Sequence, residues 1–180
     1  MNKKKVDFRD YANEIVKATP GGILLTTAYG DKINTMTIGW AGIGTNWSVP
    51  VFIAFVRKHR YTIEMLKKNP EFTINVPLGD VNKKILGFCG TKHGDEVDKV
   101  KEMNLTPVES DIVKVPGFKE LPLTLECKVV YSQSQSKEIY AQYDLMKHYP
   151  QDVDERAPGG NCDPHITFFG EIVNAYIIED

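Results

Sequence analysis

The chain has 180 residues, of which 42% are hydrophobic and 26% are charged, the usual composition of a globular protein. Its 22 basic and 24 acidic residues leave a net charge of −2, which gives no support for a general attraction to nucleic acid or to acidic membranes. No apolar stretch approaches the roughly 20 residues that span a bilayer, and no apolar signal-peptide core follows the basic start. The length predicts a single domain over residues 1–180.

The three cysteines, Cys89, Cys127 and Cys162, are odd in number and lack tight spacing. This pattern favours a reducing, cytoplasmic location over a disulfide framework. The pairs Cys89-x-x-x-His93 and Cys162-x-x-His165 could in principle combine into a zinc site, but neither lies in the context of a zinc finger. We therefore expect no metal.

The first part of the chain is expected to form a short amphipathic helix over 7–18, which Pro20 and the glycines after it end. The apolar face of this helix consists of Phe8, Tyr11, Ile15 and Val16. Strands are then expected at 22–29, 33–44 and 51–56, followed by a helix at 60–69.

In the second part, a strand at 71–77 precedes two short helices at 80–90 and 94–104, with Asp80 and Asp95 as N-caps. A long strand at 121–132, a helix at 135–150 and an exposed acidic loop at 151–164 follow. The last strand, 165–178, has a kink or bulge at Gly170. About six strands with short helices and no regular βαβ rhythm predict a mostly β fold with helical excursions, an antiparallel barrel.

The junction after the strand at 51–56 concentrates basic residues at the start of a helix. Arg57 and Arg60 flank that start, and Tyr61 and Thr62 add hydroxyl donors. A helix N-terminus has free N–H groups, and arginine side chains beside it add charge, so such a junction binds phosphate readily. The junction is a candidate phosphate cradle, and a solvated basic turn is the alternative.

Two Gly-rich stretches are further candidates for contact with a ligand. In INTMTIGWAGIG, which begins at Ile33, small and polar residues interrupt the strand, as happens where a ligand or another backbone approaches closely. CGTKHGDEVDK, from Cys89 to Lys99, is a polar turn that leads into a helix and could contact an anion or a ring. A bulged strand and a charged surface helix are the alternatives. No dinucleotide-binding G-x-G-x-x-G and no P-loop motif occurs.

Five segments, in this order, resemble the flavin reductase-like family and in particular its flavoredoxin branch. They are INTMTIGW, AFVRKHRYT, FTINVP, CGTKHGDEVDK and HITFFGEIVNAYI. The resemblance runs from about Gly22 to Tyr131 and resumes at His165. It implies an FMN-binding split β-barrel, usually a homodimer with the flavin near the subunit interface.

The resemblance also implies which residues would bind FMN. The isoalloxazine ring would be lined by Asn34, Thr35, Met36 and Thr37, and the phosphate would be held by Arg57, Arg60, Tyr61 and Thr62. Further contacts would come from Cys89, Gly90 and Thr91 in a loop, with a positive charge from Lys99. The candidate catalytic residue is His165, near the ring or the nicotinamide; a strand-end histidine bonded to the backbone is the alternative.

Two features depart from the family pattern. Lys92, His93, Gly94 and Asp95 stand where the family commonly has Ser-Gly-Arg-Asp. The segment 132–164 is longer than in many members, and would form a lid over the flavin or extend a dimer interface.

The lead hypothesis for function is an FMN-dependent oxidoreductase, in which NADH or NADPH reduces the flavin and the electrons pass to an acceptor. The alternative is an FMN-binding electron carrier that a redox partner protein reduces. A third hypothesis is a flavin-free barrel that binds another anion.

Overall fold

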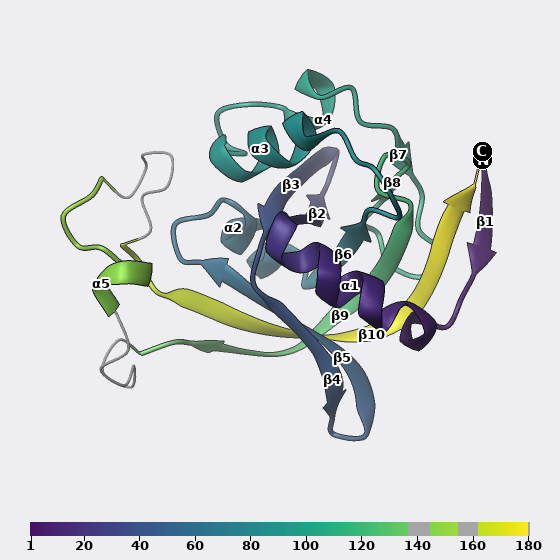
Figure 1. Ribbon diagram of the computed structural model, residues 1–180, viewed down its shortest axis with the longest axis horizontal. Coiled ribbons are helices and arrows are strands. Elements are labelled where there is room, and N and C mark those ends of the chain that lie inside the picture. Colours follow the sequence, from purple (N-terminus) through teal and green to yellow (C-terminus); the bar gives the residue numbers. More distant parts are fainter. Residues whose placement is uncertain (137–144, 155–161, 180) are drawn as a thin grey trace.

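The structure, a computed structural model, describes residues 1–136, 145–154 and 162–179. Its centre is an eight-stranded antiparallel sheet with the strand order β3-β2-β6-β9-β10-β5-β4 and with β1 beside β10 (Figure 1). The strands are β1 (Asn2–Lys5), β2 (Ile23–Tyr29), β3 (Lys32–Ile38), β4 (Ala41–Asn46), β5 (Val49–Arg57), β6 (Glu71–Val76), β9 (Leu123–Ser134) and β10 (His165–Glu179). The expected mostly β, antiparallel architecture is confirmed, although the main sheet has more strands than the sequence indicated.

Short helices and a small second sheet complete the described part of the chain. The helices are η1 (Phe8–Tyr11), α1 (Ala12–Ala18), η2 (Thr19–Gly21), α2 (Thr62–Lys68), α3 (Lys83–Thr91), α4 (Lys99–Glu102) and α5 (Leu145–His148). The second sheet pairs β7 (Pro107–Val108) with β8 (Gly117–Phe118). Helices α3 and α4 pack against β3 (Figure 1). Within the described ranges, no helix has the length and apolar character needed to cross a membrane.

Strand β10 pairs with three other strands and brings distant parts of the chain together. Its N-terminal part pairs with β5 and its C-terminal part with β1, while β9 runs along most of its length. The register with β9 shifts between Phe169 and Gly170, which confirms the bulge expected there. A Cβ on Gly170 would collide with the ring of Phe72 and lie 3.0 Å from the Cβ of Cys127, so only glycine permits this close approach.

Two clusters of buried apolar side chains fix the elements that carry the site. The larger one includes Phe52, Phe72, Ile74, Leu125 and Phe168 from the sheet. The second one joins β2 to α3 and includes Leu24, Leu86, Cys89 and Phe118. Removing this surface from water stabilises the fold. The two clusters anchor β5, which ends at the candidate site, and α3, whose last turn accepts a hydrogen bond from Arg60.

The strand expected over 33–44 is two strands in the structure. β3 ends at Ile38 and β4 begins at Ala41, with Gly39 and Trp40 between them. β3 pairs with β2, whereas β4 pairs with β5 at the other end of the strand order. The glycine-containing interruption therefore marks the point where the chain crosses between two parts of the sheet.

The helix caps differ from those expected. Asn82, not Asp80, caps α3, and Asp98, not Asp95, caps α4; each side chain accepts a backbone N–H of the first turn. Both lie directly before the first helical residue, the position from which a side chain reaches those N–H groups. α4 is also only four residues long.

The expected helix over 7–18 begins as the 3-10 turn η1 and continues as α1. Ile15 is buried as expected, but Val16 is 60% exposed, which corrects its place on the expected apolar face. The helix expected over 135–150 is seen only as α5, since 137–144 lie outside the described residues. Residues 155–161, which belong to the expected loop and to the expected lid over 132–164, also lie outside the described residues.

Candidate functional site

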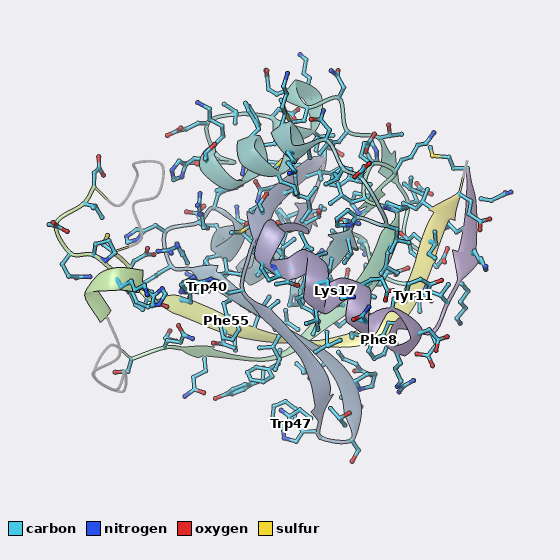
Figure 2. The ribbon with its side chains drawn as sticks, in the orientation of Figure 1. Phe8, Tyr11, Lys17, Trp40, Trp47 and Phe55 are labelled. Carbon is cyan, nitrogen blue, oxygen red and sulfur yellow. The ribbon has the colours of Figure 1, made fainter. Side chains whose placement is uncertain are left out.

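The candidate site is a cavity of about 200 Å³ where the link between β3 and β4, the end of β5 and the start of β10 meet. Its lining consists of Met36, Thr37, Ile38, Gly39, Trp40, Phe55, Arg57, Arg60 and His165. Antiparallel pairing explains this convergence, because His165 lies opposite Arg57 in the register of β10 with β5. Trp40 and Phe55 lie close together at this point, whereas Trp47 lies at the tip of the β4–β5 hairpin (Figure 2).

Arg57 occupies the centre of the basic junction. Its guanidinium carbon lies 6.0 Å from the ring centroid of Trp40 and 5.9 Å from that of Tyr149, within range of cation–π attraction. Its Nη1 atom lies 3.8 Å from Oδ1 of Asp163 and is buried without a hydrogen bond to any described residue. Burial lowers the pKa of Arg57, and Asp163 opposes that shift.

Asp163 places a buried carboxylate inside this basic cluster. Its Oδ2 atom accepts the backbone N–H of His59 at 2.9 Å and lies 2.8 Å from Nδ1 of the same residue. The sequence predicts that Asp163 lies in an exposed acidic loop, and the structure corrects this: the residue is 5% exposed. A carboxylate is retained there because the buried arginine beside it favours an opposite charge.

Arg60 and Lys99 bind the carbonyl groups at the end of α3. Nη2 of Arg60 donates to the carbonyl of Gly90 at 2.9 Å, and Nζ of Lys99 donates to those of Cys89 at 3.0 Å and Thr35 at 2.9 Å. The last carbonyls of a helix lack partners within the helix and attract cations. Burial lowers the pKa of Lys99 to about 8. Lys99 thus ties α4 to β3 and to the end of α3, and Arg60 ties the β5–α2 junction to the end of α3.

Asn34 lies on β3 beside the start of α2. Its Nδ2 atom donates to Oγ1 of Thr62 at 3.0 Å, and its Oδ1 atom is buried without a hydrogen bond to any described residue. A Cβ on Gly94 would collide with that Oδ1 atom. The glycine in the 92–95 stretch therefore lets this loop close over Asn34.

His165 lines the cavity together with the two arginines. Its Nδ1 atom lies 2.8 Å from the hydroxyl of Tyr149, and its ring centroid lies 4.9 Å from that of Trp40. Burial, and then the positive charge of Arg57, lower the pKa of His165 to about 4. The imidazole is therefore neutral near pH 7.

The structure brings some of the expected site residues into one cavity and leaves others around it. Those that line the cavity are Met36, Thr37, Arg57, Arg60 and His165. Those that do not line it are Asn34, Thr35, Tyr61, Thr62, Cys89, Gly90, Thr91 and Lys99. Cys89, Gly90 and Thr91 form the last turn of α3 rather than a loop, which corrects that part of the expectation. The Cys89 side chain lies in the core, where burial raises its pKa to about 11.

Sequence reasoning missed Trp40, Tyr149 and Asp163 as parts of this site. Trp40 directly follows the glycine at which the 33–44 segment breaks, and this position was the available signal. Tyr149 and Asp163 arrive from far along the chain, and no local pattern marks them. Among the described residues, no group of three or more His, Cys, Asp or Glu side chains is arranged to hold a metal ion.

Two other hollows differ from this cavity in their lining. The larger, about 590 Å³, includes Asp31, Asp95, Glu96 and Asp98 in its lining, and these carboxylates disfavour an anionic ligand. The other, about 390 Å³, is mostly apolar and shares Gly39, Trp40 and Phe55 with the candidate site. The candidate site thus joins a basic end to an apolar groove.

Comparison with known proteins identifies the class to which this fold and site belong. The family model for the flavin reductase like domain matches residues 16–180, so the chain belongs to the flavin reductase-like family. The resemblance noted in the sequence is confirmed, as is the split-barrel fold.

Two curated relatives are uncharacterized proteins. One, from Archaeoglobus fulgidus, is 35% identical over 100 residues, which is 56% of this chain and 55% of that protein. The other, from Pyrococcus abyssi, is 35% identical over 106 residues, 59% of each. The matches therefore span less than two thirds of these relatives.

Solved structures extend the comparison of the fold. Flavoredoxin from Methanosarcina acetivorans is 26% identical with a TM-score of 0.63, covering 88% of this chain and 68% of that one. The FMN-binding domain of a flavin reductases-like enzyme from Shewanella baltica is 16% identical with a TM-score of 0.65, covering 98% and 77%. Nitrilotriacetate monooxygenase component B from Bacillus cereus is 15% identical with a TM-score of 0.64, covering 97% and 78%.

Proposed function

We propose that the protein is an FMN-dependent oxidoreductase in which NADH or NADPH reduces the flavin and the electrons pass to an acceptor. The observation that carries this proposal is the cavity that joins Arg57, Arg60 and His165 to the β3–β4 link in a flavin reductase-like chain. FMN, when bound, supplies the hydride and electron chemistry, so the chain needs to bind it, orient it and leave one ring face open.

The residues at the site fit an anionic flavin in charge and hydrogen bonding. Two arginines stand against the single carboxylate of Asp163, so positive charge remains for a phosphate. Nη1 of Arg57, a residue that lines the cavity, is a buried polar atom that lacks a hydrogen bond within the described residues. Buried polar atoms are costly when unpaired, which supports a ligand that pairs with them.

The small volume of the cavity supports a complete flavin site to which a second copy of the chain contributes. The cavity of about 200 Å³ is below the roughly 300–1,000 Å³ typical of small-molecule sites. It can take part of the flavin, while the rest lies on the rim. We propose a homodimer whose second subunit covers that rim, in a cytoplasmic protein whose three cysteines remain free thiols.

Residue roles follow from position. Arg57 and Arg60 hold the phosphate, and the β3 residues up to Thr37 line the ring, partly through backbone groups. Lys99 adds positive charge near the site without lining the cavity, because its ammonium group already binds two carbonyl groups. His165 faces the cavity as a neutral hydrogen-bond donor, which favours negative charge on the flavin.

An FMN-binding electron carrier reduced by a redox partner protein is the second candidate. The likeness to a flavoredoxin at 26% identity and a TM-score of 0.63 favours it. Anaerobic mixing with NADH or NADPH separates the two functions: bleaching of the flavin absorbance by either nucleotide supports the oxidoreductase. Bleaching by a reduced partner protein alone would support the carrier and overturn the lead proposal.

A further inference from the structure

Two aromatic rings from different parts of the chain, those of Trp40 and Tyr149, pack against the imidazole of His165. Trp40 lies 4.9 Å from it between centroids, and Tyr149 lies 5.6 Å from it at a steep angle of 77°. Trp40 also contacts Tyr149 at 6.2 Å and His148 at 5.8 Å, both edge to face. These two rings and the contact of Nδ1 with the Tyr149 hydroxyl restrict rotation of the imidazole, so its two nitrogens face fixed directions.

The contact between Tyr149 and His165 has a definite direction of proton donation. The hydroxyl oxygen lies 2.8 Å from Nδ1 of His165, and 3.4 Å from the Oε1 atom of Gln135. The shorter contact is the stronger hydrogen bond. A phenol is a better proton donor than a neutral imidazole N–H, and the bare imidazole nitrogen is the better acceptor of the pair. The amide oxygen of Gln135 can only accept, so it competes with Nδ1 for the single proton of the Tyr149 hydroxyl. Because the contact with Nδ1 is much the shorter, the hydroxyl donates to Nδ1.

We propose that Tyr149 is a positioning residue that fixes His165 as the tautomer with its proton on Nε2, so that a neutral N–H donor faces the cavity. The partner of one imidazole nitrogen decides which nitrogen carries the proton. His165 lines the cavity, and Nε2 makes no hydrogen bond within the described part of the chain. The role of Nε2–H toward the flavin rests on the proposed function, whereas the tautomer does not.

The surrounding charges agree with a neutral donor. The low pKa of His165, about 4, results from burial and from Arg57 and Arg60, against an opposing effect of Asp163. An imidazolium next to two arginines would repel them, whereas a neutral N–H adds a donor without adding charge. Such a donor stabilises the negative charge that a flavin gains on reduction.

The first test uses the flavin-free protein. Nitrogen NMR of ¹⁵N-labelled chain at neutral pH, with His165 assigned by its loss in His165→Gln, reports which imidazole nitrogen is protonated. We expect a bare Nδ1 and a protonated Nε2, and a mixture of both tautomers in Tyr149→Phe. Tyr176→Phe is the matched control, since Tyr176 is also buried and its hydroxyl bonds elsewhere, 3.4 Å from Ser110. A protonated Nδ1, or an unchanged spectrum in Tyr149→Phe, would overturn the proposal.

The second test measures binding of oxidised and reduced FMN under anaerobic conditions. Tyr149→Phe should reduce the preference for the reduced form about fivefold, as loss of about one hydrogen bond implies. His165→Gln keeps an N–H near the Nε2 position and should retain more of that preference than His165→Asn. Equal preferences in the wild type and all three variants would refute the role of Nε2–H. Failure of the wild type to bind FMN would refute the proposed function, while the NMR result would still decide the position of the proton.

Discussion

His165, the first residue of β10, lies opposite Arg57, the last residue of β5. The two residues are far apart in sequence, and antiparallel pairing alone makes them neighbours. Trp40 joins them from the β3–β4 link, and Tyr149 and Asp163 join them from the segment before β10. One cationic group is thus enclosed by two aromatic rings, a carboxylate and a neutral imidazole.

Replacing Arg60 with Ala should weaken the binding of FMN much more than the binding of riboflavin, because only FMN carries the phosphate. A charge-assisted contact contributes about 1.5–3 kcal/mol, or roughly tenfold to over a hundredfold in affinity. Fluorescence titration of both flavins measures the difference. Arg60 also holds the carbonyl of Gly90, so riboflavin controls for any general loosening of α3. An equal loss for both flavins would assign Arg60 a structural role only.

Replacing Asp163 with Asn should strengthen FMN binding by a few fold, because one negative charge leaves the arginine cluster. The amide oxygen can still accept the backbone N–H of His59, so the local fold should persist. Affinity should rise more for FMN than for riboflavin, and the gain should fall at high salt. Asp154→Asn, in the same segment, is the control. Weaker FMN binding in Asp163→Asn would mean that the carboxylate organises the site.

Much of the fold follows from the sequence, because alternation and turn residues report which residues face the core. The strands before and after the basic junction, the helix near Thr62 and the bulge at Gly170 were predicted in this way. The break of 33–44 at Gly39 could not be predicted, since it depends on β4 pairing with β5. The burial of Asp163 could not be predicted either, because it requires the end of a long segment to return to the basic junction.

Replacing Gly94 with Ala should destabilise the protein by about 1–3 kcal/mol, because the added methyl group collides with Oδ1 of Asn34. Urea denaturation measures this cost. Gly87→Ala is the matched control, since nothing lies within 4 Å of a Cβ there and α3 should gain about 0.5–1 kcal/mol. Removing the obstacle in Asn34→Ala/Gly94→Ala should recover part of the loss. A neutral Gly94→Ala would show that the loop does not pack on Asn34.

Replacing Lys99 with Met should destabilise the protein by roughly 2–4 kcal/mol, because the buried carbonyls of Thr35 and Cys89 lose their donor. Thermal unfolding measures the loss. Lys101→Met, on the exposed side of α4, should be nearly neutral by comparison. Similar melting temperatures for the two variants would contradict the part assigned to Lys99.

Stability should fall as the pH drops from about 6.5 to about 4, partly because of His165. The folded chain keeps His165 neutral down to about pH 4, whereas the unfolded chain takes up a proton near 6.5. The stabilising contribution is therefore complete above 6.5 and is lost as the pH falls toward 4. In His165→Gln this part of the pH dependence should disappear, and in His93→Gln it should remain. If the urea midpoints of the wild type and of His165→Gln change with pH in parallel across this range, the result would contradict a buried neutral imidazole.

The most direct test of the central claim is an absorbance titration of flavin-free protein with FMN, in the wild type and in Arg57→Ala/Arg60→Ala. We predict saturable binding of one FMN per chain by the wild type, with a perturbed flavin spectrum, and a loss of at least tenfold in affinity in the double variant. A wild-type protein that leaves the FMN spectrum unchanged, or that binds FMN as tightly without the two arginines, would contradict it.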